Sequence, residues 1–287
     1  SRFEGQYVAL PVNIHRLNNL FYNIEVLETA GIDPSSISSA RGLLEALEAV
    51  RDTTDAIPLV QPWKNPDPLL QLWATTLLSE HGVDTYDAIV NGRATENRRA
   101  IEDTLGIVAE FADFVSEDAL FQDLASAPRQ FVDAEAAFFV QGDWSFSVFD
   151  EAEAFTYGRD WEHVPFPGTD GVYQMNMDAA IAAEMSDHDS AIDAFLQTAA
   201  SVDGQVAFNA PKGSIPPRTD VPTEEFSPFQ RKQMDQFEAS RSQPPSIAHG
   251  LAVRPDQHIE LLTIFASFVS TWDVDRAANE VVAVLSA

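Results

Sequence analysis

The feature that most constrains the fold of this chain is the alternation of short strand-like runs with longer helical segments. Strand-like runs occur at 7–12, 136–140 and 161–165. In segments such as 39–50 and 96–115, apolar residues recur every three to four positions, which is the spacing of a helix with one buried face. Short strands alternating with longer helices are typical of α/β architecture. The chain has no repeat and no low-complexity linker, so any two lobes must be joined by ordered crossings.

Other segments refine this picture. Further helices are expected at 69–78, 256–270 and 273–285, and a further strand at 172–177. The segment 189–200 is also predicted to be helical, with Phe195 facing the interior. By contrast, 209–218 holds three prolines and one glycine, which favours an ordered loop because proline lacks an N–H donor. The longest apolar runs fall well short of the roughly 20 residues that a membrane-spanning helix needs.

Acidic residues dominate the composition. The 287 residues include 45 Asp and Glu against 17 Lys and Arg, which gives a net charge of −28. A field this negative repels phosphate, so nucleic acid is not expected as a partner. The rarity of lysine beside so many acids resembles proteins of extreme halophiles, in which concentrated salt screens self-repulsion. This interpretation is favoured over the simpler alternative of a solvated acidic surface. Cysteine is absent, which removes disulfide, thiolate-metal and cysteine-nucleophile chemistry.

Several motifs of enzymes and cofactor-binding proteins are missing. The chain has neither of the phosphate-binding loops G-x-x-x-x-G-K-S/T and G-x-G-x-x-G, nor the nucleophile elbow G-x-S-x-G. The six histidines show no metal-ligand spacing, and His188 is interpreted as part of a solvated helix start. No cofactor and no metal are therefore expected. A glycoside hydrolase needs two facing carboxylates, and 45 acids give no particular pair specific support.

Five strings occur in one order along the chain. They are YVALPVNIHRLNNLFYN at 7–23, the helix start at 39–47, AAFFVQGDW at 136–144, VPFPGTDGVY at 164–173, and NAPKGSIPPRTD at 209–220 with SIAHG at 246–250. Together they resemble the extracellular solute-binding proteins of ABC importers, in the sugar-binding branch that includes maltose- and glucose-binding proteins. The last two strings are most similar to the glucose/mannose-type members. Gly42 stands where the family has Glu, so the capping box is lost and only the Ser39 cap remains.

The resemblance implies an α/β fold of the type II periplasmic-binding-protein class, with two lobes. Three crossings between the lobes are expected near 18–23, 163–168 and 213–217. Residues 1–19 and 165–215 are expected to form the remnant of the first lobe, and 20–164 with 216–287 the second. Family members carry on the order of a hundred residues before the first string, a length typical of a lobe. The first lobe is therefore expected to be incomplete.

The resemblance also implies a function. Members bind a mono- or small oligosaccharide in the cleft, close on it by hinge motion and deliver it to the permease subunits of an ABC importer. No chemistry takes place. The protein is then expected to be a monomer, extracellular or at the cell surface and peripheral to the membrane. The resemblance implies an N-terminal segment before the first string, and a lipid anchor on that segment is compatible with this expectation.

The same resemblance selects residues that would hold the sugar. They are Trp144, Asp178, Lys212, His249 and, more remotely, His15. Trp144 matches the family's stacking aromatic and would cover the apolar C–H face of a pyranose. The acid, amine and imidazole would bond its hydroxyls, because hydrogen bonds to charged groups contribute about 1.5–3 kcal/mol each. Trp63, Trp73 and Trp272 are assigned to the core, and Trp161 is a weaker candidate for the cleft.

A purely structural alternative stays open for each of these residues. Trp144 could be a core tryptophan, and Asp178 a turn acid on an acidic surface. Lys212 could be a solvated lysine, although lysine is otherwise rare here. His249 could fill a loop-packing role. For His15, which lies at a crossing, packing at the hinge is favoured over contact with the sugar.

Two other functions remain open. The first is a receptor of the same fold for a non-sugar ligand, such as an organic acid, a polyamine or iron. Such a cleft needs several cations or paired tyrosines, and this chain has five tyrosines and few bases. The second is a carbohydrate-active hydrolase, which requires two carboxylates at hydrolytic separation.

Overall fold

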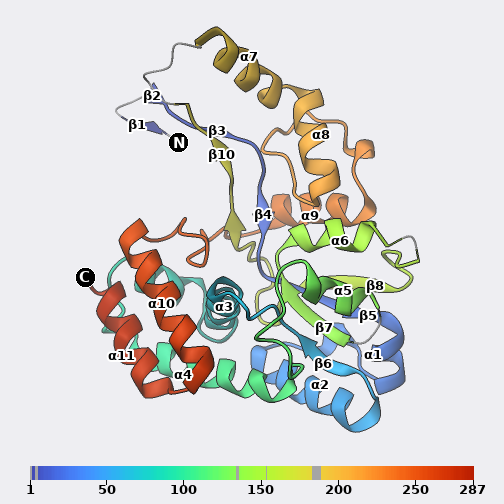
Figure 1. The fold of residues 1–287 in the computed structure, drawn as a ribbon, viewed down its shortest axis with the longest axis vertical. Helices are drawn as coiled ribbons and strands as arrows, with labels where there is room; N and C mark the ends of the chain where they lie inside the picture. Colours follow the sequence, from blue (N-terminus) through green and yellow to red (C-terminus); the bar gives the residue numbers. More distant parts are fainter. Residues whose placement is uncertain (1, 4–5, 134–135, 153, 183–188) are drawn as a thin grey trace.

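A four-stranded sheet lies at the centre of the molecule. The computed structural model describes residues 2–3, 6–133, 136–152, 154–182 and 189–287 (Figure 1). The sheet has the order β6-β7-β5-β8, formed by Ile57–Val60 (β6), Ala136–Gln141 (β7), Asn19–Asn23 (β5) and Trp161–Pro165 (β8). β6 and β7 are parallel, whereas β5 is antiparallel to both of its neighbours. The strands expected at 136–140 and 161–165 are therefore confirmed.

Helices pack against this sheet and against one another. They are α1 (Ile24–Ala30), α2 (Ala40–Thr53), α3 (Pro66–Val90), α4 (Arg98–Phe111), α5 (Ser126–Val132), α6 (Phe146–Asp150), α10 (Pro255–Thr271) and α11 (Val274–Leu285). Short 3-10 turns are η1 (Pro34–Ser36), η2 (Ala112–Phe114), η3 (Asp143–Ser145) and η4 (Thr223–Glu225). α3, α4, α10 and α11 contact each other in a bundle beside the sheet (Figure 1). The Ser39 hydroxyl accepts a hydrogen bond from the N–H of Gly42 at 3.0 Å, so the predicted cap of α2 is confirmed.

A smaller set of elements extends above the sheet in Figure 1. It comprises β1 (Arg2–Phe3), β2 (Gln6–Tyr7), β3 (Leu10–Pro11), β4 (His15–Arg16), β9 (Met175–Asn176), β10 (Ala179–Ala180), α7 (Asp189–Ala200) and α8 (Val202–Lys212), with α9 (Pro228–Ala239) at its base. β3 pairs with β10 and β4 with β9, both antiparallel. The strand expected at 7–12 is thus divided between β2 and β3, and the one at 172–177 shortens to β9.

Two sequence expectations are wrong in this upper part. The loop expected at 209–218 begins later, because α8 continues to Lys212 with Pro211 in its last turn. A proline so close to the end removes a single helical hydrogen bond, and Gly213, at φ 84°, then ends the helix in the left-handed conformation. The side chain of Phe195 is 63% exposed instead of buried, because periodicity marks an apolar face without saying that anything covers it. The helix start interpreted at His188 lies outside the described residues.

Buried aromatic rings fix the core. Trp63, Trp73 and Trp161 are 4%, 0% and 1% exposed, so the first two are core residues as predicted. The weaker assignment of Trp161 to the cleft is wrong, because its ring packs 4.8 Å from that of Phe149. Trp272, half-buried, packs 5.4 Å from Trp63. Within the described ranges, no helix has the length and apolarity that crossing a membrane requires.

Phe149 lies at the centre of this aromatic cluster, in contact with Phe21, Phe131 and Trp161. Phe149→Ala should lower the free energy of unfolding by about 3–5 kcal/mol, because it removes buried apolar surface and leaves a cavity. Urea denaturation of both proteins measures the difference. Phe121→Ala is the control: that ring is 79% exposed, so its loss should cost less than about 0.5 kcal/mol. Equal losses in the two variants would contradict the packing.

Candidate functional site

Trp144 follows the buried strand β7 after one turn. Its half-buried indole folds back over the backbone of Gly142, where an added Cβ would lie only 2.3 Å from the ring carbons. Real Cβ atoms never approach a ring so closely, so this ring position requires glycine at 142. The turn Gln141-Gly142-Asp143 noted in the sequence therefore sets where the indole lies.

Two imidazoles frame the indole. The ring of His15 lies 5.2 Å from that of Trp144 at an interplanar angle of 79°, and the ring of His249 lies 5.3 Å away at 61°. Both contacts are edge-to-face, the favourable arrangement for aromatic quadrupoles. Three of the residues selected from the sequence therefore come together, from β4, η3 and the loop before α10.

Asp143 fixes the His15 side of this cluster. Its carboxylate is fully buried, and one oxygen is hydrogen-bonded to Nδ1 of His15. The other oxygen accepts the backbone N–H of Arg16 at 2.9 Å. Nε2 of His15 lies 3.0 Å from Nδ2 of Asn13, which can only donate. Nδ1 of His15 therefore donates to Asp143, and Nε2 faces the Asn13 amide as an acceptor.

An ion pair forms the other side of the cluster. Nζ of Lys212 donates to Oδ2 of Asp178 at 2.8 Å, and Nδ2 of Asn13 donates to the same oxygen at 2.8 Å. Because Nδ2 of Asn13 also faces Nε2 of His15, acid, amine and imidazole are joined through the Asn13 amide. The side chains of Asp178 and Lys212 remain 47% and 32% exposed, so they can still meet a ligand.

The pKa shifts follow from this geometry. Partial burial acts to raise the pKa of Asp178, but the hydrogen bonds from Lys212 and Asn13 outweigh it and hold the pKa below the ordinary value. Burial lowers the pKa of the His249 imidazole to about 4. Asp178 is consequently an anion and His249 neutral at pH 7.

All five residues selected from the sequence thus gather in one place, while two others of the cluster were missed. Asn13 and Asp143 bind the selected groups together, and neither belongs to a pattern that indicates a site. The available signal was adjacency: Asp143 directly precedes Trp144, and Asn13 stands two residues before His15.

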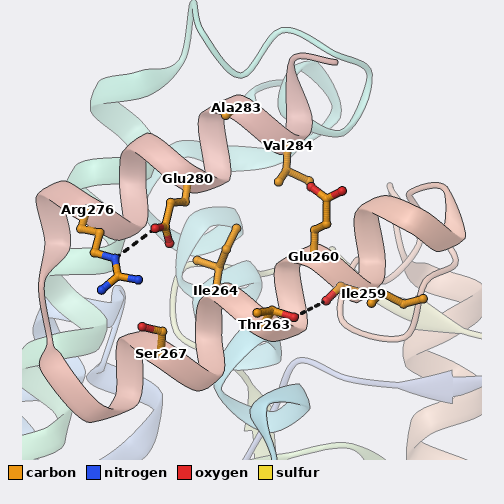
Figure 2. Close-up of a pocket in the computed structure, with 9 residues that line it drawn as sticks. All are labelled: Ile259, Glu260, Thr263, Ile264, Ser267, Arg276, Glu280, Ala283 and Val284. Atoms are coloured by element: carbon orange, nitrogen blue, oxygen red, sulfur yellow. Dashed lines mark hydrogen bonds and ion pairs between the residues drawn. The ribbon is translucent and has the colours of Figure 1, made fainter.

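One surface hollow lies apart from this cluster. A surface hollow of about 420 Å³ lies between α10 and α11, lined by apolar side chains such as Ile264 and Val284 and by the Arg276–Glu280 ion pair (Figure 2). None of the five selected residues lines it. Among the residues that the structure describes, no three His, Asp or Glu side chains are grouped to hold a metal ion.

Comparisons with known proteins indicate the family. The family of bacterial extracellular solute-binding proteins matches residues 2–234. A xylose/arabinose-binding protein of Haloferax volcanii is 35% identical over 99% of this chain and 62% of its own length. An ABC transporter extracellular-binding protein of Pyrococcus horikoshii, itself uncharacterized, is 30% identical over 98% of this chain and 63% of its own. The chain thus spans less than two thirds of these relatives.

Solved structures show the same fold at low identity. A chitin oligosaccharide binding protein superposes with a TM-score of 0.84 at 16% identity, over 99% of this chain and 72% of that one. A bacterial solute receptor described as preferring β-D-galactopyranose reaches 0.82 at 15% identity, over 100% and 72%. The expected α/β fold of the periplasmic-binding-protein class is therefore confirmed.

Gly142→Ala should displace the indole of Trp144, because the new Cβ and the ring cannot share the same space. Nuclear magnetic resonance should show a large chemical-shift change for the indole N–H of Trp144. The ring protons of His15 and His249 should shift as well. Gly106→Ala in α4 is the matched control, since nothing lies within 4 Å of its added Cβ. An unchanged Trp144 resonance in Gly142→Ala would contradict the close approach.

His249 should make stability depend on pH. Its pKa falls from 6.5 to about 4 on folding, so the unfolded chain binds the proton more tightly. The free energy of unfolding should decline as pH falls from 6.5 towards 4, and this residue should account for up to about 3 kcal/mol of the decline. Above pH 6.5, His249 should make no contribution to the pH dependence. Urea denaturation at pH 7 and 4.5 measures the decline, which His249→Gln should reduce. Identical pH profiles for the two proteins would refute this assignment.

Proposed function

Because the chain belongs to the family of bacterial extracellular solute-binding proteins, we propose that it binds an uncharged mono- or small oligosaccharide beside Trp144 and delivers it to the permease subunits of an ABC importer. The observation that carries the proposal is the half-buried indole with an exposed ion pair and two imidazoles around it. An aromatic face suits the C–H face of a pyranose, and the polar groups suit its rim of hydroxyls.

The charge balance favours an uncharged ligand. Asp178 and Lys212 are paired, so the exposed part of the cluster carries no excess charge. A receptor for an organic acid needs an unpaired cation, and one for a polyamine needs unpaired carboxylates. The names of the relatives point the same way: the Haloferax protein binds xylose and arabinose, and one from Mesorhizobium japonicum is a probable sugar-binding protein.

Binding without catalysis fits these residues better than hydrolysis. The buried carboxylate of Asp143 already accepts hydrogen bonds from His15 and Arg16. Among the described residues that these hydrogen bonds join, Asp178 is the carboxylate that remains accessible, whereas a hydrolase needs two across the scissile bond. The hydrolase remains the second candidate, and turnover of aryl glycosides would decide in its favour.

The division of the chain into two lobes is also part of this proposal. We assign 1–19 with 165–215 to the first lobe and 20–164 with 216–287 to the second, with the sugar between them. Lys212 and Asp178 then face Trp144 and His249 from the opposite lobe. Closure would bury the sugar and form the surface that the permease recognises. The receptor would act as a monomer at the membrane surface.

Trp144→Ala should weaken sugar binding at least tenfold, because it removes the stacking face at a cost of about 1.5 kcal/mol or more. Isothermal titration calorimetry of the complete protein against a panel of mono- and disaccharides measures this. Trp73→Phe, in the core beside Phe265, is the matched control and should leave the Kd within about twofold. The absence of heat from every sugar with the unaltered protein would overturn the function.

A further inference from the structure

Helix α9 carries three glutamines, at every third position, whose side chains contact the segments around His15 and Lys212. Gln230, Gln233 and Gln236 lie on one stripe of the helix because residues three apart share a face. We propose that this glutamine row positions the His15 and Lys212 sides of the site relative to each other and holds the lobe crossings. The inference rests on the proposed function, and no residue of the row touches the sugar.

Gln230 holds the Lys212 side. Its fully buried Nε2 donates to the carbonyl oxygen of Asn209 at 2.8 Å and to that of Ser214 at 2.9 Å. These two carbonyls bracket Lys212, so a single amide fixes the last turn of α8 and the chain that leaves it. Oε1 of the same side chain accepts the backbone N–H of Ser227 and closes the capping box of α9.

Gln233 and Gln236 hold the His15 side. The buried Nε2 of Gln233 donates to Oδ1 of Asn19 at 2.9 Å, and Nδ2 of Asn19 donates to the carbonyl of Arg16 at 3.1 Å. Oε1 of Gln236 accepts from Nη1 of Arg16 at 2.5 Å and lies 3.3 Å from Nε2 of His163. The segment that follows His15 is therefore tied to α9 at Arg16 and at Asn19.

Arg16 strengthens this attachment. Its side chain is 2% exposed, and burial lowers its pKa to about 10, so it stays charged at neutral pH. It also donates to Oδ1 of Asn18 at 3.2 Å and to the carbonyl of Val172 at 3.3 Å. A buried cation needs all of its hydrogen bonds, which makes displacement of this junction costly.

The row reaches each of the crossings expected from the sequence. Its partners Asn19, His163 and Ser214 lie within or beside 18–23, 163–168 and 213–217 respectively. The helix itself is anchored to the sheet by Phe229, whose ring lies 4.9 Å from that of His163 in β8 and stacks on that of Phe146 in α6 at 5.3 Å. Figure 1 shows α9 between α8 and α6, at the junction of the upper elements with the sheet. Movement of any crossing must therefore break or shift a bond to this row.

The test replaces single glutamines by methionine, which keeps the volume and removes the amide. Gln230→Met in the complete protein should raise the Kd for the best sugar of the panel about tenfold, at unchanged stoichiometry, because Lys212 is no longer held in place. Gln236 is half-buried, so Gln236→Met is the milder second variant and should also raise the Kd. Gln257→Met is the matched control: its Nε2 donates to the carbonyl of Val284 at 2.9 Å in the helical bundle, so stability should fall without a change in Kd.

A second readout needs no sugar. The chain has no cysteine, so spin labels at Gln197→Cys in α7 and Asp52→Cys in α2 report one distance between the upper elements and the sheet. Double electron–electron resonance should show a shifted or broadened distance distribution in Gln230→Met and Gln236→Met. The distribution in Gln257→Met should be unchanged. An unchanged distance in all three variants would overturn the inference. A protein that binds no sugar, yet shows the shift, would overturn the proposed function alone.

Discussion

The buried carboxylate of Asp143 is the constraint on which the rest of the site depends. It joins the end of β7 to β4 by accepting from the His15 ring and from the backbone of Arg16, two contacts that cross between chain segments. A buried carboxylate is tolerated only when its oxygens are hydrogen-bonded, so this junction has little freedom to rearrange. The indole of the next residue is consequently held beside the His15 ring.

Two glycines allow the chain to close around that junction. Gly142 gives the indole room to fold onto the backbone. At Gly213, an added Cβ would lie 2.6 Å from the carbonyl oxygen of Asp143, so the turn after Lys212 packs directly on the same residue. The Lys212 ammonium reaches Asp178 from this turn, and Asn13 links Asp178 back to His15. The site is thus one connected polar structure built on a single buried acid.

The sequence was informative where local forces decide the structure. Strands at 136–141 and 161–165, and helices such as α2, α4, α10 and α11, follow from apolar spacing and from caps such as Ser39. It misled where the outcome depends on neighbours. Pro211 and Gly213 indicated a loop, although the helix extends to Lys212, and Phe195 is exposed although its spacing predicted a buried side chain.

By itself, the sequence determined the strongly periodic elements, such as α2 and β7, and the residue types of the site, because periodicity, turn chemistry and short strings are properties of neighbouring residues. The tertiary structure alone decided which groups meet. Asp143 bonds to a histidine 128 positions away, Asn13 to an acid 165 positions away, and the glutamines of α9 to partners up to 220 positions away. The sequence around a single Asn, Asp or Gln does not indicate such a role. Its hydrogen bond becomes important only when folding buries it beside a partner that is distant in the sequence.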